Sequence, residues 1–274
     1  MIPTFEEQTI ELEGVANARE LGGYENTEGR KVKKGLLIRT GSLNKATPKD
    51  IEKLSKEIGL KLIFDFRSNE EINNKRDKEI PGAENIQLDL LFRINNQTIK
   101  KIFMDKSSLE KDEHPVIHMC RNETLIEYMT KLYGRLLQDT HAHNLYNQMF
   151  KQILATGGAP VLWHCAYGKD RTGLAAMLIL SVLGVDLPTI KEDFMRTNIA
   201  YKRTIDMLLK MAKEENFTEA QIWTVKSISG VAEESFDSGY KVITDQYGGI
   251  DKYLRNQIML TEEEISKFRE YYLE

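Results

Sequence analysis

The sequence predicts an α/β fold in which a central, mostly parallel sheet is flanked by helices. Three short apolar runs, at 36–39, 61–66 and 161–163, have the length and composition of buried strands. Segments of helical length separate them, and strands that alternate with helices are typical of a parallel sheet. Beyond Gly184 the chain reads as helical to its end, so a helical C-terminal half is expected to follow the sheet.

The N-terminal elements can be placed in order. Residues 2–12 are expected to form an extended lead-in, because apolar residues alternate there with glutamates. Gly22-Gly23 marks a turn before the first strand. A helix is then predicted to begin with Thr47 as its N-cap and Pro48 at its first position, and to end near Gly59.

Strands are predicted at 61–66 and at 85–90. After the second of them, the sequence loses clear hydrophobic periodicity. Between residues 91 and 115, lysines mix with apolar residues, which is more typical of a lid over a site than of a core sheet. Helices are predicted at 123–137 and 145–154, where apolar residues recur at helical spacing. The range 91–155 is therefore expected to be a helical lid insertion within the fold.

Helices fill the rest of the chain. One long helix is predicted from Thr189 to Lys213, after the break at Pro188. Two more begin at Thr218 and Thr261, each with Gln or Glu three residues later, as in a capping box. No repeat, low-complexity tract or linker divides the sequence, so residues 1–274 are expected to form a single domain.

The strand at 161–163 leads into the stretch around which the chain is organised. A loop rich in glycine and charge follows it, and a second apolar segment of helical length begins at Leu174. Backbone N–H groups and the positive end of the helix dipole converge in such a loop, which makes it an anion site. Cys165 stands at the mouth of this loop, the setting in which cysteines act as nucleophiles. Arg171 adds a fork of donors that suits a phosphate group.

The same stretch has two other possible interpretations. A cysteine at the end of a buried strand is commonly an inert, small apolar residue, and a Cys-x5-Arg spacing alone is weak evidence. A nucleotide-binding P-loop is excluded by the residues, because Asp170 follows Gly168-Lys169 where Ser or Thr is required. The whole string in its strand–loop–helix setting favours a catalytic loop.

The loop reads His164-Cys165-Ala166-Tyr167-Gly168-Lys169-Asp170-Arg171-Thr172-Gly173. This string resembles the signature loop of the cysteine-dependent protein tyrosine phosphatases. Its Lys-Asp-Arg ending is similar to that of the bacterial and fungal tyrosine and dual-specificity phosphatases that also act on phosphoinositides. Further blocks resemble that family along nearly the whole chain, namely Asn17–Tyr24, Gly35–Gly41, Phe64–Ser68 and Tyr247–Ile250. Thr40 stands where the family usually has serine.

The resemblance implies a tyrosine-phosphatase-like fold and metal-independent hydrolysis of phosphate monoesters. Phosphotyrosine in proteins is the first expectation for the substrate, with dual-specificity or phosphoinositide substrates as further options. The Cys165 thiolate would attack phosphorus and form a cysteinyl-phosphate. His164 would fix the surroundings of the thiolate, and Thr172 would donate its hydroxyl to the sulfur when it leaves. Phosphate oxygens would be held by the Arg171 guanidinium and by the N–H groups of the loop, from Ala166, Tyr167, Gly168, Lys169, Asp170 and Arg171.

The leaving group needs a proton, and two carboxyl groups are candidates for the general acid. Asp65 ends a neighbouring strand, at the sheet edge where the chemistry of α/β proteins gathers. We lean to Asp65, because a carboxylate inside the cradle repels phosphate, although a structural pairing with Arg67 explains Asp65 equally well. Asp170 stays open, since the resemblance places such an aspartate facing substrate. Lys169 is expected to be a mobile positive charge suited to a second phosphate.

Other classes of protein stay open as alternatives. A rhodanese-like sulfur transferase or an arsenate reductase also uses a Cys-x5-Arg loop, and a catalytically silent phospho-binding module would keep the cradle. Cysteine, arginine and an acid candidate occur together, which argues against the silent module. Cys120 is too distant in sequence to be assumed to act as a resolving cysteine. Arg19 is expected to pair with a carboxylate and to order the N-terminal loop.

The composition of the chain bears on its possible partners, metal ions and location. A net charge of -4 gives no reason to expect a nucleic-acid partner, and no apolar run is long enough to span a membrane. With two cysteines, a disulfide scaffold is excluded, and both are expected to be reduced. No cofactor or metal is expected, because no recognised ligand motif includes His114, His118, Cys120, His141 or His143. A cytoplasmic location is the expectation, with an exported form left open if a signal peptide has been removed.

Overall fold

The computed structural model describes residues 2–91 and 114–274 and confirms the α/β architecture. In the described part of the chain, a five-stranded sheet has the strand order β1-β2-β5-β3-β4. The first pair is antiparallel, whereas β2, β5, β3 and β4 run parallel to one another. The strands are β1 (Arg19–Glu20), β2 (Leu37–Thr40), β3 (Leu62–Asp65), β4 (Glu84–Gln87) and β5 (Val161–His164).

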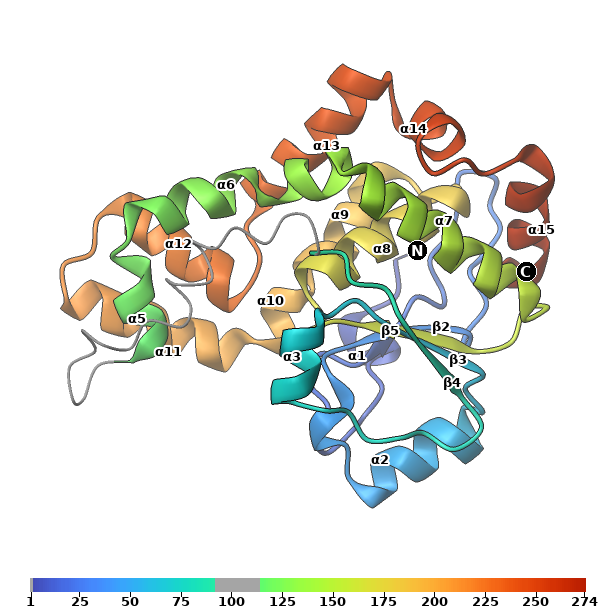
Figure 1. Ribbon diagram of the computed structural model, residues 1–274, viewed down its shortest axis with the longest axis horizontal. Helices are drawn as coiled ribbons and strands as arrows, with labels where there is room; N and C mark the ends of the chain where they lie inside the picture. The colour runs from blue at the N-terminus through green and yellow to red at the C-terminus, as the bar shows by residue number, and fades with distance from the viewer. Residues whose placement is uncertain (1, 92–113) are drawn as a thin grey trace.

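Helices surround this sheet (Figure 1). Those before β5 are α1 (Phe5–Gln8), α2 (Pro48–Glu52), which continues as a π-helical turn (Lys53–Glu57), α3 (Asn69–Asn74), α5 (Pro115–Cys120), α6 (Glu123–Gln138) and α7 (Thr140–Ala155). A 3-10 turn (Leu43–Lys45) precedes α2. Those after β5 are α8 (Asp170–Val182), α9 (Leu187–Met195), α10 (Thr197–Ala200), α11 (Lys202–Glu214), α12 (Glu219–Ser229), α13 (Glu233–Tyr247), α14 (Ile250–Asn256) and α15 (Glu262–Tyr272).

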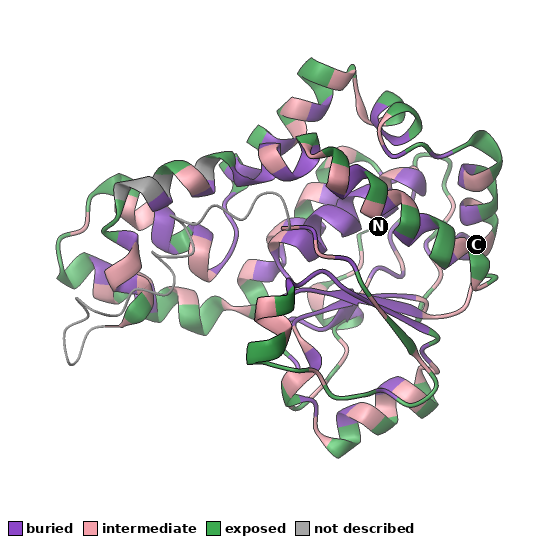
Figure 2. Cartoon of the chain, viewed as in Figure 1, coloured by how far each residue is buried: buried purple, intermediate pink, exposed green. Residues whose placement is uncertain are grey.

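The three central strands β2, β3 and β5 are buried on both faces, as the strands of parallel sheets normally are. Successive strand residues alternate between two cores, because side chains along a strand point to opposite faces. In β5, Val161 and Trp163 belong to the large core formed with α6, α7 and α8, while Leu162 belongs to a smaller core on the other face. That smaller core also contains Leu54, next to α2. Figure 2 shows the central strands β2, β3 and β5 as buried, whereas the edge strand β4 is mostly exposed.

A second group of helices lies away from the sheet. We call α5, α11 and α12 the helical arm; together with the first part of α6 they extend from the body of the molecule (Figure 1). The arm has a small apolar core of its own, made by Ile117, Cys120, Leu208, Ala212 and Val225. Met119 of α5 and Trp223 and Ile228 of α12 also pack against the large core, so apolar contacts join the arm to the rest of the protein.

Several boundaries differ from the sequence-based expectations. The N-terminal lead-in contains the short helix α1, which Thr4 caps through a capping box. The expected long helix from Thr189 to Lys213 is wrong: it is divided into α9, α10 and α11. The chain turns between them so that Arg196 donates to the Pro3 carbonyl and the Tyr201 hydroxyl donates to the Tyr167 carbonyl, and these tertiary contacts override helical propensity.

The helices expected at 123–137 and 145–154 are confirmed as α6 and α7, and the two capping boxes at Thr218 and Thr261 are present. Much of the expected lid stretch, residues 92–113, lies outside the described residues. Among the helices that are described, none has a run of apolar residues long enough to cross a bilayer.

Candidate active site

The carboxyl ends of the parallel strands meet at one edge of the sheet, and the predicted loop begins there. Thr40 and Asp65, the last residues of β2 and β3, both lie beside His164 at the end of β5. Cys165 follows and is only 2% exposed, and the loop ends at Asp170, the first residue of α8. The structure therefore brings the candidate nucleophile, a helix N-terminus and two neighbouring strand ends together, at the position where α/β sheets bind ligands.

Three consecutive carbonyl groups, those of residues 166–168, point outward from the loop. Their donors are the Ser42 N–H (3.3 Å to Ala166 O), the Tyr201 hydroxyl (2.8 Å to Tyr167 O), the Asn17 amide (2.8 Å to Gly168 O) and the Arg39 guanidinium (3.0 Å to Gly168 O). In a trans peptide the N–H points away from the carbonyl of the same unit. The N–H groups of residues 167–169 therefore point to the inner side of the loop, which forms a nest for an anion.

Gly168 is required by this geometry for two reasons. Its φ of +65° lies in the left-handed region, which costs other residues conformational energy. A Cβ at this position would also lie 2.3 Å from the carbonyl oxygen of Thr40, at the end of β2. Since that oxygen belongs to the backbone of a buried strand, it cannot move away without distorting the sheet. The close approach of loop and strand therefore excludes every side chain.

Gly168→Ala is expected to lower the free energy of unfolding by about 1–3 kcal/mol and to impair the phosphate-ester hydrolysis that the sequence leads us to expect. The matched control is Gly59→Ala, which has a similar φ of +70° but no atom within 4 Å of the added Cβ. Thermal or urea unfolding separates the two variants, and kinetics on an aryl phosphate reports the loop. Equal activities for both variants would show that the approach to Thr40 does not shape the site.

A fully buried charge cluster supports the loop from behind. The Asp193 carboxylate accepts hydrogen bonds from the guanidinium groups of Arg39 (2.6 Å) and Arg19 (3.3 Å), and Arg19 also donates to the side-chain oxygen of Asn17. Burial would raise the pKa of Asp193, but the charges of Arg19 and Arg39 outweigh burial and hold it below its usual value. The expectation that Arg19 pairs with a carboxylate is confirmed. Asn17 and Arg39 carry this support to the carbonyl of Gly168.

Arg171, the second residue of α8, is held in place by Glu71 of α3. Its guanidinium donates to the two carboxylate oxygens of Glu71 at 2.8 and 2.7 Å and to the Phe66 carbonyl at 3.0 Å. Burial would lower the pKa of Arg171, but the negative charges of Cys165, Glu71 and Asp170 outweigh it and raise the pKa above its usual value. This pairing leaves Nε–H and one Nη2–H to donate to phosphate oxygens, so Arg171 is both fixed and able to bind an anion.

The sequence analysis did not identify Glu71. Its signal was the Ser68-x-x-Glu71 spacing, because Glu71 accepts from the Ser68 N–H (2.9 Å) and the Ser68 hydroxyl accepts from the Glu71 N–H (3.3 Å). This capping box begins α3 directly after β3 and fixes the carboxylate of Glu71 opposite Arg171. A capping pattern next to a candidate site can therefore position a functional side chain.

Asp65 lies in a second buried network, which the sequence analysis allowed as its alternative role. Both of its carboxylate oxygens accept from the Arg67 guanidinium, at 2.9 and 2.7 Å, and Asp65 is 3% exposed. Burial would raise the pKa of Asp65, but the hydrogen bonds and charge of Arg67 outweigh it and lower the pKa. This geometry favours a structural role for Asp65 over the proton transfer to which the sequence analysis leaned.

The same network reaches His164. Its Nε2 lies 3.2 Å from an oxygen of Asp77, which also accepts from Arg67 at 2.5 Å, while its Nδ1 lies 3.3 Å from the carbonyl oxygen of Cys165. Asp65, Asp77 and His164 form the one group of potential metal ligands found close together in residues 2–91 and 114–274, and Arg67 bonds both of its carboxylates. The network holds the backbone of the nucleophile from the side opposite the Asp193 cluster.

Asp170 and Lys169 face the helical half of the protein. Asp170 accepts a hydrogen bond of 2.6 Å from the hydroxyl of Tyr133 in α6, and its side chain is 19% exposed. The side chain of Lys169 is buried, and its ammonium donates to the carbonyl groups of Ser227, Ile228 and Gly230 at 2.7–2.8 Å. The expectation of a mobile lysine is therefore wrong for this structure.

Thr172 and Cys120 complete the sequence-predicted residues. Thr172 is fully buried, its carbonyl accepts from the Trp163 indole at 3.1 Å, and its hydroxyl has no hydrogen-bond partner in the described part of the protein. Cys120 belongs to the core of the helical arm, and burial raises the pKa of its thiol to about 12. Cys120 therefore has the properties of an inert core residue.

Comparison with known proteins shows the family to which the chain is similar. A model of the tyrosine phosphatase family matches residues 10–274. A tyrosine-protein phosphatase of Cupriavidus necator is 26% identical over 266 residues, which cover 96% of this chain and 88% of the relative. The triple specificity protein phosphatase PtpB of Mycobacterium tuberculosis is 24% identical over 267 residues, 90% of this chain and 92% of the relative.

A tyrosine-protein phosphatase of Nostoc commune matches a shorter part, with 28% identity over 158 residues, 58% of this chain and 47% of the relative. The family model covers nearly the whole chain, including every element that holds the candidate site. The assignment to the family therefore rests on a match to nearly the whole chain. The chain belongs to the tyrosine phosphatase family and is a phosphoric monoester hydrolase.

Proposed function

We propose that this phosphatase hydrolyses its substrate in two steps through a cysteinyl-phosphate on Cys165. The observation that carries the proposal is the orientation of the loop peptides: three outward carbonyl groups are bonded to neighbouring elements, so the N–H groups turn inward. Arg171 lies at the end of the same loop with its guanidinium fixed by Glu71. Such an anion nest holds the oxygens of a phosphate group beside the Cys165 sulfur.

In the first step, the Cys165 thiolate attacks phosphorus in line with the ester oxygen. A sulfur–phosphorus bond forms as the phosphorus–oxygen bond to the leaving group breaks, and the leaving oxygen takes a proton from a general acid. In the second step, water attacks phosphorus, its proton passes to a general base, and the thiolate leaves with inorganic phosphate as the product. The loop N–H groups and Arg171 stabilise the charge on the equatorial oxygens in both steps.

Asp170 is the residue that we propose for the acid and base. It lies at the N-terminus of α8 in the loop itself, it is partly exposed, and Tyr133 fixes its orientation. Asp65 is fully engaged with Arg67. A third carboxyl group, Asp89 just after β4, is half-buried; burial raises its pKa, which the charge of Arg171 partly offsets. Asp89 therefore serves as a comparison for Asp170 in the experiments below.

Phosphotyrosine is the substrate class that the site favours. Cys165 is 2% exposed, so the phosphate of a substrate must reach a sulfur atom that lies below the surface, and a phenyl ring reaches further than the short side chains of serine or threonine. Tyr167, in the loop, is 58% exposed and offers an aromatic surface next to the entrance. The relative from M. tuberculosis is named a triple specificity protein phosphatase, which favours testing more than one substrate class. Phosphoserine, phosphothreonine and phosphoinositides are the alternatives that we compare.

The test is a hydrolysis panel with p-nitrophenyl phosphate, matched phosphotyrosine and phosphoserine peptides, and a soluble phosphoinositide. We expect the aryl phosphates to be hydrolysed with the highest kcat/KM, and activity to persist in the presence of a chelator. Alkylation by iodoacetamide should inactivate the enzyme at Cys165, with protection by inorganic phosphate, while Cys120 should remain unlabelled because burial raises its pKa to about 12. Loss of activity on chelation, or equal labelling of both cysteines, would contradict the mechanism.

A further inference from the structure

Lys169 is placed unusually for a lysine in an anion-binding loop. Its side chain leaves the loop and ends at the carbonyl oxygens of Ser227 (2.8 Å), Ile228 (2.7 Å) and Gly230 (2.8 Å). Lys169 is only 5% exposed, and its nitrogen is also 3.6 Å from a carboxylate oxygen of Asp170. A lysine ammonium has three N–H donors, and each has a backbone carbonyl as its partner here. The ammonium is therefore saturated within the protein.

The three carbonyl groups belong to the end of α12 and the connection that follows it. Carbonyl groups in the last turn of a helix have no partner within the helix, and the helix dipole places partial negative charge there. Ser227 and Ile228 are in this last turn, and Gly230 is the C-cap. A buried cation from a distant part of the chain thus replaces the missing helical hydrogen bonds. Removing it would leave three buried acceptors without their charged donor, which is costly.

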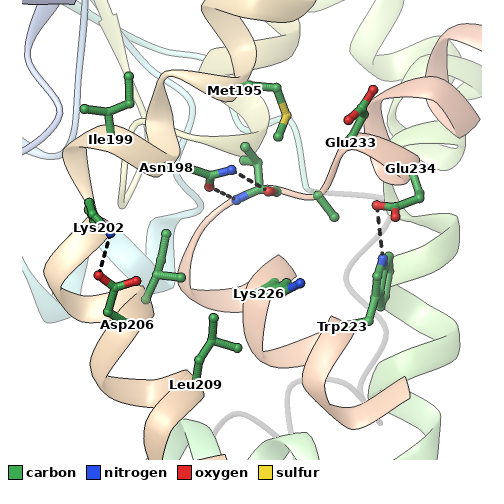
Figure 3. Close-up of a pocket in the computed structure, with 13 residues that line it drawn as sticks. Met195, Asn198, Ile199, Lys202, Asp206, Leu209, Trp223, Lys226, Glu233 and Glu234 are labelled. Carbon is green, nitrogen blue, oxygen red and sulfur yellow. Dashed lines mark hydrogen bonds and ion pairs between the residues drawn. The ribbon is translucent and has the colours of Figure 1, made fainter. Parts of the chain in front are cut away.

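The opposite side of this connection is held just as closely. Asn198 donates to the Val231 carbonyl at 3.0 Å and accepts from the Val231 N–H at 2.8 Å, and a Cβ on Gly230 would lie 2.3 Å from the Asn198 oxygen. Figure 3 shows Asn198 bonded to this connection above a groove of about 480 Å³ that Lys226 and Trp223 line from the α12 side. The chain between α12 and α13 is therefore held by hydrogen bonds with both Asn198 and Lys169.

Asp170, the next residue of the loop, makes a second link to the helical half through the Tyr133 hydroxyl in α6. Two consecutive residues of the catalytic loop thus contact two different helices, and α12 is part of the helical arm, whose core is separate from the main one. We propose that Lys169 is a positioning residue, which fastens the helical arm to the catalytic loop and so holds Asp170 and Arg171 in place, and that its ammonium does not bind a second phosphate of the substrate.

This inference rests on the proposed function. Lys169 could act as a ligand for a second phosphate of the substrate or as a positioning residue, and the two roles have different kinetic consequences. As a ligand, Lys169 would matter only for substrates with a second phosphate, and its loss would raise their KM. As a positioning residue, it matters for every substrate, because it acts on the geometry of the loop. The split between kcat and KM, compared across substrates with one and two phosphates, distinguishes these roles.

The experiment replaces Lys169 by methionine, which keeps the length and apolar stem but removes the donors. With p-nitrophenyl phosphate and a soluble phosphatidylinositol bisphosphate, we expect kcat to fall by about 10–100-fold for both substrates, with the ratio of their KM values unchanged. Hydrogen–deuterium exchange should become faster at residues 227–232. Lys169→Arg, which keeps a buried cation, should recover part of kcat. The matched control is Lys226→Met, an exposed lysine of α12, which should leave kinetics and exchange unchanged.

A selective rise in KM for the bisphosphate, with unchanged kcat on p-nitrophenyl phosphate, would overturn the proposal and make Lys169 a substrate ligand. Unchanged exchange at 227–232 in Lys169→Met would overturn it as well. If the methionine variant does not fold, Lys169→Gln takes its place with the same expectations. Absence of hydrolysis in the wild type would refute the proposed function, whereas the exchange comparison would still decide whether Lys169 fastens the arm.

Discussion

Cys165→Ser is expected to lower kcat on p-nitrophenyl phosphate by about 10⁶-fold, or to the background rate, while inorganic phosphate still binds. The loss follows because a serine hydroxyl beside the anion nest is a much weaker nucleophile than a thiolate, and the reaction has no other route through a covalent intermediate. Binding should persist because the nest consists of backbone N–H groups and Arg171, which the substitution leaves in place. Initial rates and calorimetric titration with phosphate measure the two properties separately.

Cys120→Ser is the matched control for this substitution. Cys120 is fully buried in the core of the helical arm, so its replacement should cost stability but leave kcat of the folded protein near the wild-type value. Thermal unfolding of both variants checks that lost activity does not come from lost folding. Hydrolysis by Cys165→Ser at a rate within tenfold of the wild type would exclude Cys165 as the nucleophile and would make the cysteinyl-phosphate untenable.

The sequence was most informative where one local pattern determines local structure. The apolar run before Cys165, the glycine in the loop and the apolar helix after it predicted the strand, the loop and α8, and the structure has all three. The mostly parallel arrangement and the position of Asp65 at the end of a strand next to β5 also followed, because strands that alternate with helices share a direction. The fold class could therefore be predicted from periodicity together with the loop.

Contacts between distant segments could not be predicted in the same way. Glu71 lies 100 residues from Arg171, and the carbonyl groups that bind Lys169 lie about 60 residues further along the chain. The expected long helix from Thr189 to Lys213 was wrong for the same reason, since the Tyr201 hydroxyl contacts the loop carbonyl of Tyr167 and the chain turns to allow it. Tertiary hydrogen bonds at such positions outweigh helical propensities of less than about 1 kcal/mol per residue.

The roles of the charged residues in and beside the loop could not be predicted from the sequence either. Type and spacing identified Lys169, Asp170 and Asp65 as candidates, but the direction in which each side chain points decides its role. Lys169 points to the end of α12 and Asp65 to Arg67, whereas Asp170 stays at the loop and contacts Tyr133. The sequence shows which charged residues lie in the loop. The direction of each side chain depends on its packing against the helical half of the protein, which the sequence does not show.

Asp170→Asn is expected to lower kcat by about 10²–10⁴-fold for phosphotyrosine peptides and far less for an activated aryl phosphate. A general acid matters most when the leaving oxygen is basic, and a nitrophenolate departs without help. The amide keeps the size of the side chain and can still bond the Tyr133 hydroxyl, so folding should be preserved. The basic limb of the pH profile should flatten in the variant, because the proton donor that produces it has been removed.

Asp65→Asn should behave differently. It leaves the buried Arg67 without its bidentate partner, so we expect a loss of about 3–5 kcal/mol in the free energy of unfolding, with little dependence on the leaving group. Because the folded state lowers the pKa of Asp65, its stabilising effect is present above the unfolded value of about 3.9 and is lost as the pH falls through the lower folded value. The stability difference from the wild type should therefore shrink in strong acid.

Asp89→Asn completes the comparison, since Asp89 is half-buried and its carboxyl has a raised pKa caused by burial. If Asp170 is the acid, only Asp170→Asn shows both the dependence on the leaving group and the flattened basic limb. If Asp65→Asn or Asp89→Asn shows that pair of effects while Asp170→Asn does not, the proton comes from a neighbouring strand end instead of the loop. The leaving-group series decides among the three carboxyl groups, because stability and substrate affinity do not change with the basicity of the departing oxygen.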